Sequence, residues 1–188
     1  MKLIGSINHW RFDPAGWIGS AIMLSFAGIA AWRWQNSSLI FFALLFLRDA
    51  SAAWFLISRN PDQSKKQVGW VDVLAYVSCG SVFLYLNQSQ PLFVHAETVS
   101  SVLAIVGFAI STIALFEIGA SFGVSPANRG LVKTGIYRFV KHPMYLGYGI
   151  AEIGLVFLNP LNGLIFVFSV GLYLARIHFE NTALKINV

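Results

Sequence analysis

The sequence has 188 residues, of which 56% are hydrophobic and only 11% are charged, and its mean hydropathy is +0.66. A soluble domain averages about 25% charged residues, so this composition excludes an ordinary water-soluble fold and predicts a polytopic membrane protein. The net charge of +5 comes from basic residues in short loops between apolar runs, and membrane orientation explains that placement better than nucleic-acid binding does. The single cysteine, Cys79, excludes an intramolecular disulfide.

Four apolar runs within the first 120 residues are each close to the length that a membrane-crossing helix needs. Residues 16–32 are rich in Ala, Gly and Ser, which suits close helix packing. Because no convincing small-residue cleavage site follows them, we expect a retained span rather than a signal peptide. The other three runs cover residues 38–57, 68–86 and 98–120.

The second run contains two charged neighbours, Arg48 and Asp49. Both side chains are unfavourable in lipid. Because neighbours in sequence do not face each other on a helix, we expect each of them to have a partner elsewhere. Each charge is then either paired with a residue on another helix or exposed to a water-filled cavity.

A helical hairpin is predicted at the C-terminal end of the chain. Its first arm covers residues 143–158, and Pro143 suits the first helical turn because the missing N–H is not needed there. Its second arm covers residues 164–179, after the turn sequence Asn-Pro-Leu-Asn-Gly. Each arm is short for a membrane crossing, so the pair would tilt or depend on flanking residues. Glu152 is an acid within the first arm and is a candidate for lining a cavity.

With six crossings, the basic residues divide unequally between the two sides of the membrane. Arg33 stands alone on one side and Arg48 lies inside a span, whereas the other eleven of the 13 Lys and Arg share a side with both termini. An excess of Lys and Arg marks the cytoplasmic side. We therefore expect both termini and the loop between the fourth and fifth spans to face the cytoplasm, in a bacterial inner membrane or the endoplasmic reticulum. The eleven are Lys2, Arg11, Arg59, Lys65, Lys66, Arg129, Lys133, Arg138, Lys141, Arg176 and Lys185.

The sequence lacks the common metal and nucleotide motifs. The four histidines have no partner at zinc-ligand spacing, and neither H-E-x-x-H nor C-x-x-C occurs, so no metal site is expected. There is no P-loop. The Gly147-Tyr148-Gly149 segment has no third glycine and no preceding strand, which argues against a Rossmann site.

A two-part polar group remains at the predicted cytoplasmic end of the hairpin. An antiparallel hairpin brings the start of its first arm close to the end of its second, and residues four apart on the second arm share one helix face. Two interpretations stay open. One is a simple ion pair next to a basic loop that fixes topology, and the other is a binding site for an anionic or amphiphilic ligand. The residues are Tyr137, His142 and Tyr145 on one side, and Arg176 and Glu180 on the other.

Several ordered motifs follow one another between residues 121 and 184. They are an L-V-x-x-G-x-Y turn, a basic-His-Pro-x-Tyr-x-Gly segment, Asn-Pro at a hairpin tip, and Arg-x-x-x-Glu. Together they resemble the core of the isoprenylcysteine carboxyl methyltransferase family and its bacterial and phospholipid methyltransferase relatives. The resemblance covers about a third of the chain, and it is specific for the superfamily but not for the substrate. The residues that carry it are Leu131, Val132, Gly135, Tyr137, Lys141, His142, Pro143, Tyr145, Gly147, Asn159, Pro160, Arg176 and Glu180.

The resemblance implies an all-α integral membrane enzyme of five to six hydrophobic helices that uses S-adenosylmethionine without a Rossmann domain. Residues 1–188 would form one membrane domain, with residues 1–120 as a scaffold of about four helices and residues 121–188 as the cofactor-binding region. The acceptor would be lipid-like, hydrophobic or prenylated, such as an isoprenylcysteine carboxylate. Arg176 would bind its anionic group and act with Glu180 in catalysis. The cofactor contacts would be Arg129, Gly130, Leu131, Val132, Tyr137, His142, Pro143, Met144, Tyr145 and Glu180.

Two departures from the family pattern keep alternatives open. Asn181 stands where the family usually has a second Glu, and the family usually continues beyond this point into an amphipathic tail that helps to close the cofactor site. Both departures favour a non-catalytic membrane scaffold or sensor, whereas the intact motif residues favour the enzyme. A membrane reductase that uses NADPH on a related scaffold is the second enzymatic alternative.

Overall fold

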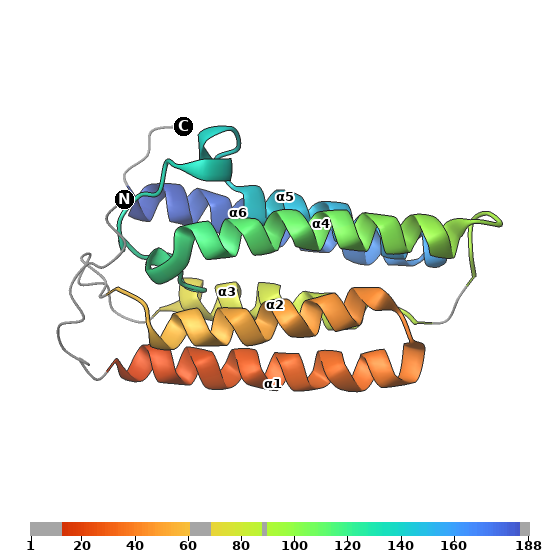
Figure 1. The fold of residues 1–188 in the computed structure, drawn as a ribbon, viewed down its shortest axis with the longest axis horizontal. Helices are drawn as coiled ribbons and strands as arrows, with labels where there is room; N and C mark the ends of the chain where they lie inside the picture. Colours follow the sequence, from red (N-terminus) through yellow and green to blue (C-terminus); the bar gives the residue numbers. More distant parts are fainter. Residues whose placement is uncertain (1–12, 61–68, 88–89, 185–188) are drawn as a thin grey trace.

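The computed structural model describes residues 13–60, 69–87 and 90–184, which form a bundle of six α-helices (Figure 1). Short 3₁₀ turns extend or connect them, and these described ranges contain no β-strand. The all-α fold predicted from the sequence is therefore confirmed. The helices are α1 Pro14–Ser37, α2 Ile40–Ile57, α3 Trp70–Gly80, α4 Ala96–Ile118, α5 Pro143–Leu158 and α6 Asn162–Ala183, and the turns are η1 Ser81–Leu84, η2 Gly119–Ser121 and η3 Gly135–Arg138.

Four of the helical segments are long and apolar enough to cross a membrane, so this is a multi-pass membrane protein with four candidate spans. They are Pro14–Ser37, Ile40–Ile57, Ala96–Ser121 and Asn162–Ala183. The other two apolar helices, Trp70–Leu84 and Pro143–Leu158, are shorter. At 1.5 Å per residue a helix as long as α5 measures only about 24 Å, against a hydrocarbon core of about 30 Å.

The helices alternate in direction along the chain, so that α1, α3 and α5 begin at the end of the bundle where α2, α4 and α6 finish (Figure 1). We call this end, which carries His142, the His142 end. The segments that meet there carry the described loop cations, whereas Arg33 lies near the opposite end on α1. These described loop cations are Arg59, Arg129, Lys133, Arg138 and Lys141. His9, Lys2, Arg11, Lys65, Lys66 and Lys185 lie outside the described residues.

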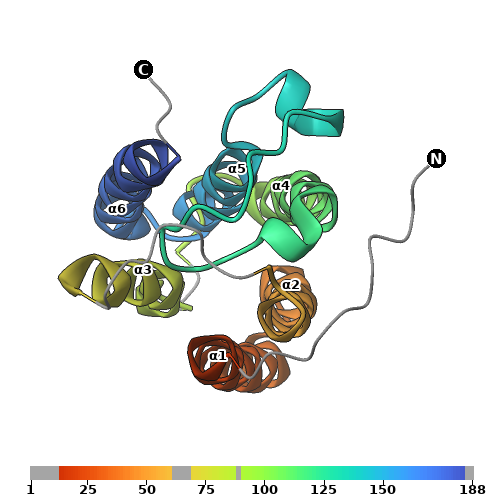
Figure 2. The same ribbon diagram turned by 90° about the vertical axis from the view of Figure 1, so that its left-hand side faces the viewer.

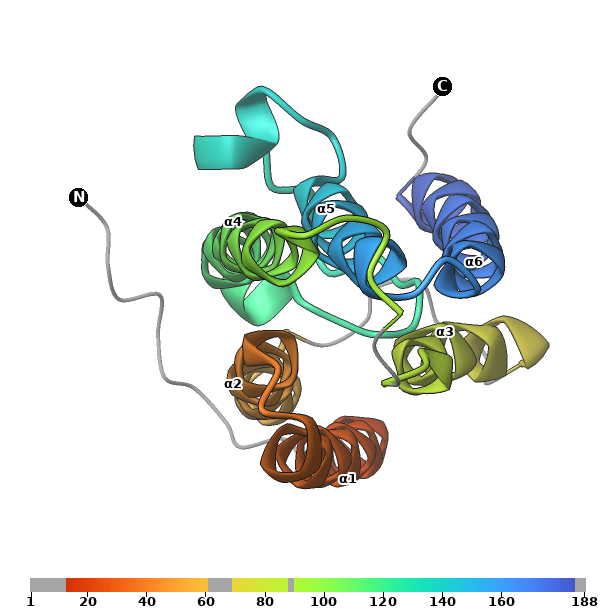
Figure 3. The same cartoon turned by 90° about the vertical axis from the view of Figure 1, so that its right-hand side faces the viewer.

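Viewed along its length, the bundle is a ring of helices in the order α1, α2, α4, α5, α6, α3 (Figures 2 and 3). The ring of helices closes between α1 and the α3–η1 segment. There the centroids of the Phe26 and Phe83 side-chain rings are 5.6 Å apart. Arg33 strengthens this closure by donating hydrogen bonds to the carbonyl oxygens of Phe83 at 2.6 Å and Tyr85 at 2.5 Å. Because the ring is closed, polar side chains inside it are shielded from lipid.

The first helix begins at a well-formed cap. Asp13 accepts a hydrogen bond from the Gly16 N–H at 3.0 Å, and Arg59 at the end of α2 donates from Nε to its carboxylate at 2.7 Å. Partial burial would raise the pKa of Asp13, but the hydrogen bonds from Arg59 and Gly16 outweigh it, so this pKa is lower than usual. The cap therefore also ties α1 to α2.

Helices α4 and α5 pack with their backbones in close approach. A side chain at Gly107 would overlap the carbonyl oxygen of Gly147, and a side chain at Gly147 would overlap that of Gly107. A side chain at Gly154 would be in tight contact with Ser100, although without the same overlap. Small residues at such contacts are the usual means by which membrane helices associate. This packing holds the start of α5 firmly against the scaffold.

The expectation for Arg48 and Asp49 was wrong in one respect. The two neighbours pair with each other, with Nη1 of Arg48 at 2.8 Å from Oδ1 of Asp49. The arginine side chain is long enough to fold back along the helix, so adjacency does not prevent contact. Its guanidinium also lies over the ring of Tyr148, 4.6 Å from the ring centre. Both residues are buried inside the ring of helices.

The second hairpin arm is longer than residues 164–179. Helix α6 begins at Asn162 and continues to Ala183. The side chain of Asn162 accepts a hydrogen bond from the Leu86 N–H at 2.8 Å, which anchors the turn to the end of η1. At the other end, Glu180 and Asn181 remain helical although they are polar, because both contact the start of α5.

Candidate functional site

The polar residues predicted from the hairpin motifs do meet at the His142 end. His142 precedes α5 as its N-cap, and Pro143 occupies the first turn. Tyr145 follows within that turn and is buried. Helix α6 presents Arg176 and Glu180 to the same place, one turn apart. The hairpin thus brings both parts of the predicted group together.

Glu180 is the centre of this cluster. Its carboxylate accepts a short hydrogen bond from the Tyr145 hydroxyl. One carboxylate oxygen lies 3.6 Å from Nδ1 of His142, and the other lies 3.8 Å from Nη2 of Arg176. The side chain remains 21% exposed, so a ligand can still reach it. Glu180 therefore gathers one hydroxyl donor and two potential cations around a single carboxylate.

His142 has an acceptor on each side of its ring. Its Nε2 lies 3.0 Å from Oδ1 of Asn181, and its Nδ1 faces Glu180. The adjacent carboxylate of Glu180 raises the pKa of His142 above its usual value, against the opposing effects of partial burial and of Lys141. Sequence reasoning missed the contact with Asn181. Its place directly after Glu180 on the hairpin arm was the only available signal.

Arg176 is more deeply engaged in the bundle than its predicted role suggests. Nη1 donates to the Ser78 hydroxyl at 2.9 Å, and Nη2 donates to the carbonyl oxygen of Val124 at 2.9 Å. Its guanidinium also lies 5.2 Å from the centre of the Tyr145 ring. Arg176 thereby links α6 to α3 and to the loop after α4. The role of Arg176 in binding the methyl acceptor stays a prediction.

The loop between α4 and α5 holds the other predicted cofactor residues. Gly130 has a φ of 101°, a left-handed conformation that favours glycine. Arg129 is buried and its carbonyl oxygen accepts a hydrogen bond from Ser121 at 3.1 Å. Leu131 is 47% exposed, so Gly130 and Leu131 form a surface stretch, while Val132 is half-buried.

Tyr137 and Met144 lie nearer to the bundle. The Tyr137 hydroxyl donates to the carbonyl oxygen of Ala114 on α4 at 3.3 Å. Burial is the main reason why the pKa of Tyr137 is raised, and the nearby charge of Glu180 adds to it. Met144 packs against the hydrophobic cluster that includes Leu115 and Val124.

An apolar groove of about 250 Å³ opens beside the cluster, between α5 and α6. His142 and Tyr145 form its polar end. Leu146 and Leu174, which are 46% and 62% exposed, place its rim on the outer surface of the bundle. Gly149 contributes no side chain there, and a Cβ at this position would meet nothing within 4 Å. The remaining lining residues are Val170, Tyr173 and Ile177.

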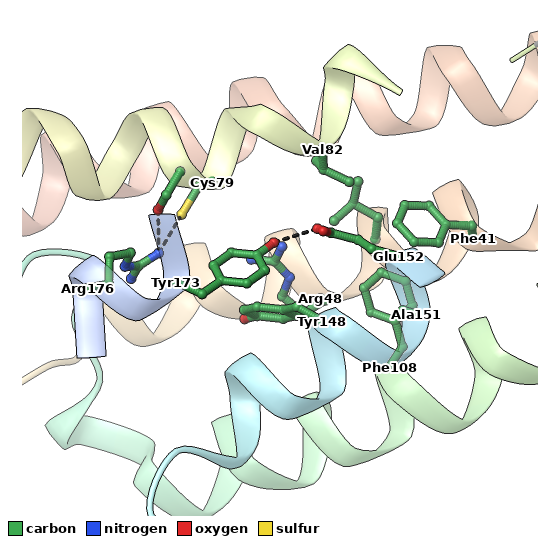
Figure 4. Close-up of a pocket in the computed structure, with 12 residues that line it drawn as sticks. Phe41, Arg48, Cys79, Val82, Phe108, Tyr148, Ala151, Glu152, Tyr173 and Arg176 are labelled. Carbon is green, nitrogen blue, oxygen red and sulfur yellow. Dashed lines mark hydrogen bonds between the residues drawn. The ribbon is translucent and has the colours of Figure 1, made fainter. Parts of the chain in front are cut away.

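A second, much smaller cavity lies inside the ring of helices (Figure 4). Its volume of about 10 Å³ suits about one water molecule. Glu152 lines it, as predicted, and accepts hydrogen bonds from the hydroxyls of Tyr85 at 3.0 Å and Tyr173 at 2.5 Å. Arg48 and Arg176 line it as well. Tyr173 lines both this cavity and the groove.

Comparison with known proteins relates this part of the chain to a known family. Residues 99–186 match the model of the isoprenylcysteine carboxyl methyltransferase (ICMT) family. Through this region the chain is similar to the ICMT family. A stretch of 73 residues is also 41% identical to Protein-S-isoprenylcysteine O-methyltransferase of Saccharomyces cerevisiae. That alignment covers 35% of this chain and 30% of the yeast protein. No solved structure matches the chain.

The region that matches the ICMT-family model begins earlier than the resemblance seen in the motifs. It includes nearly all of α4, the following loop, α5 and α6. All of the predicted site residues fall within it. The extension to residue 99 matters because α4 contacts both the loop, through Ile136 and Tyr137, and α5, through Gly147.

The residues at the His142 end fit the chemistry of the cofactor that the family implies. S-adenosylmethionine carries a sulfonium, an ammonium and a carboxylate, and its cations call for an anionic partner and aromatic faces. Glu180 provides the carboxylate, and the rings of Tyr145 and Tyr173, 5.6 Å apart, provide aromatic faces. Among the described residues, no group of three His, Cys, Asp or Glu could hold a metal ion.

Proposed function

We propose that this chain is an S-adenosylmethionine-dependent methyltransferase that acts on a membrane-embedded, lipid-like acceptor. The observation that carries the proposal is the position of the Glu180 cluster at the polar end of the apolar groove. Cofactor-binding chemistry and a lipid-sized apolar surface thus meet at His142 and Tyr145. Similarity to the ICMT family supports the same reaction class.

In this proposal Glu180 and the nearby rings hold the cationic part of the cofactor. S-adenosylmethionine, when bound, supplies a methyl group on a positively charged sulfur. The carboxylate of Glu180 attracts that charge, while Tyr145 keeps the carboxylate oriented through its hydroxyl. His142 and Pro143 close one side, and the exposed loop around Gly130 and Leu131 offers backbone groups to the rest of the molecule.

The acceptor's apolar part occupies the groove between α5 and α6. Leu146 and Leu174 at its rim face the outer surface, so a lipid can enter sideways from the membrane. An anionic end, such as an isoprenylcysteine carboxylate, then points toward Arg176. The longest polar contact of this arginine, 3.8 Å to Glu180, is the one that an incoming carboxylate would replace most readily.

The residues then act mainly by alignment. A carboxylate acceptor is already nucleophilic and requires no general base, so the site needs only to hold acceptor and methyl donor in line. Burial of Tyr145 and Arg176 keeps water away from that line. We also propose that the His142 end faces the cytoplasm, where the cofactor is available, as the distribution of Lys and Arg predicts.

The test is calorimetric titration of the detergent-purified protein with S-adenosylhomocysteine, with NADPH as the comparison ligand. We expect micromolar binding of S-adenosylhomocysteine that is lost in Glu180→Ala and retained in Glu97→Ala, an exposed acid at the far end of α4. Arg176→Ala should keep cofactor binding but impair methylation of a farnesylcysteine acceptor.

Three results would contradict the proposal in different ways. Binding of NADPH without S-adenosylhomocysteine would indicate a membrane reductase. Absence of binding of both ligands would indicate a non-catalytic membrane scaffold. Wild-type affinity in both Glu180→Ala and His142→Ala would leave the cofactor elsewhere in the chain.

A further inference from the structure

Glu117 occupies an unusual position for an acid. It lies in the last turn of α4, where the negative end of the helix dipole disfavours a carboxylate. The residue is also half-buried. A carboxylate in that place needs a donor, and one lies close by, because Oε2 of Glu117 accepts the Ile136 N–H at 2.6 Å. This bond connects α4 to η3, across 18 intervening residues of sequence.

Gly135 is fitted to the same carboxylate. It has a φ of 54°, in the left-handed region that favours glycine. A Cβ built at this position would also overlap the carboxylate of Glu117. The turn therefore rests directly on the acid, and glycine is required there for both reasons.

A second bond fixes the same turn to the same helix. The Tyr137 hydroxyl donates to the carbonyl oxygen of Ala114, which lies one turn before Glu117 on α4. The two hydrogen bonds orient Tyr137 and fix the position along α4 at which the chain leaves η3. Only three residues then separate η3 from His142, so the position of η3 also determines where His142 begins α5.

We propose that Glu117 is a positioning residue of the cofactor site, acting through Ile136 and Gly135 to hold Tyr137 and His142 in place. This inference rests on the proposed function. Glu117 itself does not touch the Glu180 cluster. The α4–α5 interface is built separately from Gly107, Gly147 and Ala151, so removal of Glu117 should loosen the site without dismantling the bundle.

The test compares Glu117→Ala, Glu117→Gln and Glu97→Ala. Glu97 is an exposed acid on the same helix but at its opposite end, which makes it a matched control. Affinity for S-adenosylhomocysteine is measured by calorimetry, thermal unfolding is measured without ligand, and hydrogen exchange is followed at the Ile136 amide. We expect Glu117→Ala to weaken binding about tenfold, as the loss of one charge-assisted hydrogen bond would. Its Ile136 amide should exchange faster, and its unfolding midpoint should stay near that of the wild type.

Rescue by the conservative variant separates positioning from a general loss of stability. The amide oxygen of Glu117→Gln can still accept the Ile136 N–H, so binding and exchange should return to nearly wild-type values, as in Glu97→Ala. Wild-type binding in Glu117→Ala would overturn the proposal. So would a large fall in its unfolding midpoint that Gln does not restore. If the wild type itself fails to bind S-adenosylhomocysteine, the proposed function fails and the positioning role fails with it. The Ile136 exchange rates then still decide if Glu117 holds the turn.

Discussion

His142 and Asn181 show how one residue sets the protonation of another at the site. Asn181 offers a neutral oxygen to one ring nitrogen, while Glu180 offers a charged oxygen to the other. A ring with acceptors on both sides is stabilised as the imidazolium, in which both nitrogens donate. The cation then neutralises part of the Glu180 charge that the cofactor would use. His142 and the cofactor therefore compete for the same carboxylate.

This competition predicts a pH dependence of cofactor affinity. Because the folded pKa of His142 is raised, the imidazolium persists somewhat above the usual pKa of about 6.5. Affinity for S-adenosylmethionine should rise with pH through that folded pKa, by at most about tenfold per unit. Calorimetry between pH 6 and 9 measures it, and His142→Asn should flatten the curve. An equally steep curve in that variant would assign the titration to another group.

The stability of the unliganded protein should change in the opposite direction. A raised folded pKa stabilises the folded state fully below the unfolded pKa, and this contribution disappears as pH rises through the folded pKa. The unfolding midpoint of the wild type should therefore fall slightly across this range relative to His142→Asn. Parallel curves for the two proteins would show that the ion pair with Glu180 does not form in solution.

Asn181→Asp tests the other side of the ring. A charged acceptor would favour the imidazolium further and should move the pH midpoint of cofactor binding upward by about one unit. Asn181→Ala removes the acceptor and should move the midpoint downward. The same calorimetric titrations give both values. A midpoint that is identical in all three proteins would mean that position 181 does not face His142.

At this scale the sequence predicts which residue types meet but not how they bond. The four-residue spacing of Arg176 and Glu180, together with the hairpin, was enough to bring them near His142 and Tyr145. It could not reveal that Arg176 bonds to Ser78 and Val124, since those contacts depend on the path of a loop between distant helices. The pairing of Arg48 with Asp49 was missed for a related reason, because spacing rules ignore the reach of a long side chain.

Among the helices, the contact between α4 and α5 carries the most specific requirement. Gly107 and Gly147 let the two backbones approach until each carbonyl oxygen lies where the other residue's side chain would be. Nearly all of α4 and the whole of α5 lie in the region that matches the ICMT-family model. The start of α5, including His142 and Tyr145, is therefore positioned by an interface with almost no room for adjustment.

Two glycines on α5 provide a matched test of this interface. Gly147→Val should clash with Gly107 and Ser111 and lower the free energy of unfolding by about 1–3 kcal/mol, the usual range for overpacking. Gly149→Ala faces open space and should be neutral or stabilise the helix by up to about 1 kcal/mol. Denaturant titration in detergent compares them. Equal destabilisation by the two substitutions would mean that the close contact of Gly147 with α4 is not what limits stability.

Hydropathy predicted where the helices are but not where they end. All six segments exist, and residues 143–158 match α5 at both ends. The predicted end of the last helix at residue 179 was too early, because an apolar window stops at Glu180 although the backbone continues to Ala183. The contacts of Glu180 and Asn181 with α5 stabilise that polar turn. Long-range contacts of this kind cannot be predicted from the local amino-acid composition.

At the scale of the whole molecule, the closed ring of helices encloses charges that lipid would not tolerate. Arg48 and Asp49 lie on α2 between two hydrophobic clusters, one containing Leu45 and the other Ala52. Tyr148 covers the guanidinium from α5. A charge pair inside a membrane protein is stable only when its partners remain in place. The ring order, with α2 facing α4 and α3 facing α6, keeps those partners together.

The pair should therefore be far more damaging to break than to replace. Arg48→Met leaves Asp49 buried without its 2.8 Å partner and should lower the free energy of unfolding by about 3–5 kcal/mol. The double variant Arg48→Met with Asp49→Leu removes both charges and should recover most of that loss, because burying an ion pair stabilises little more than apolar packing does. Denaturant titration of the three proteins measures the difference. A double variant as unstable as the single one would mean that the interior needs the charges themselves, and loss of S-adenosylhomocysteine binding in a stable double variant would extend the cofactor site into the ring.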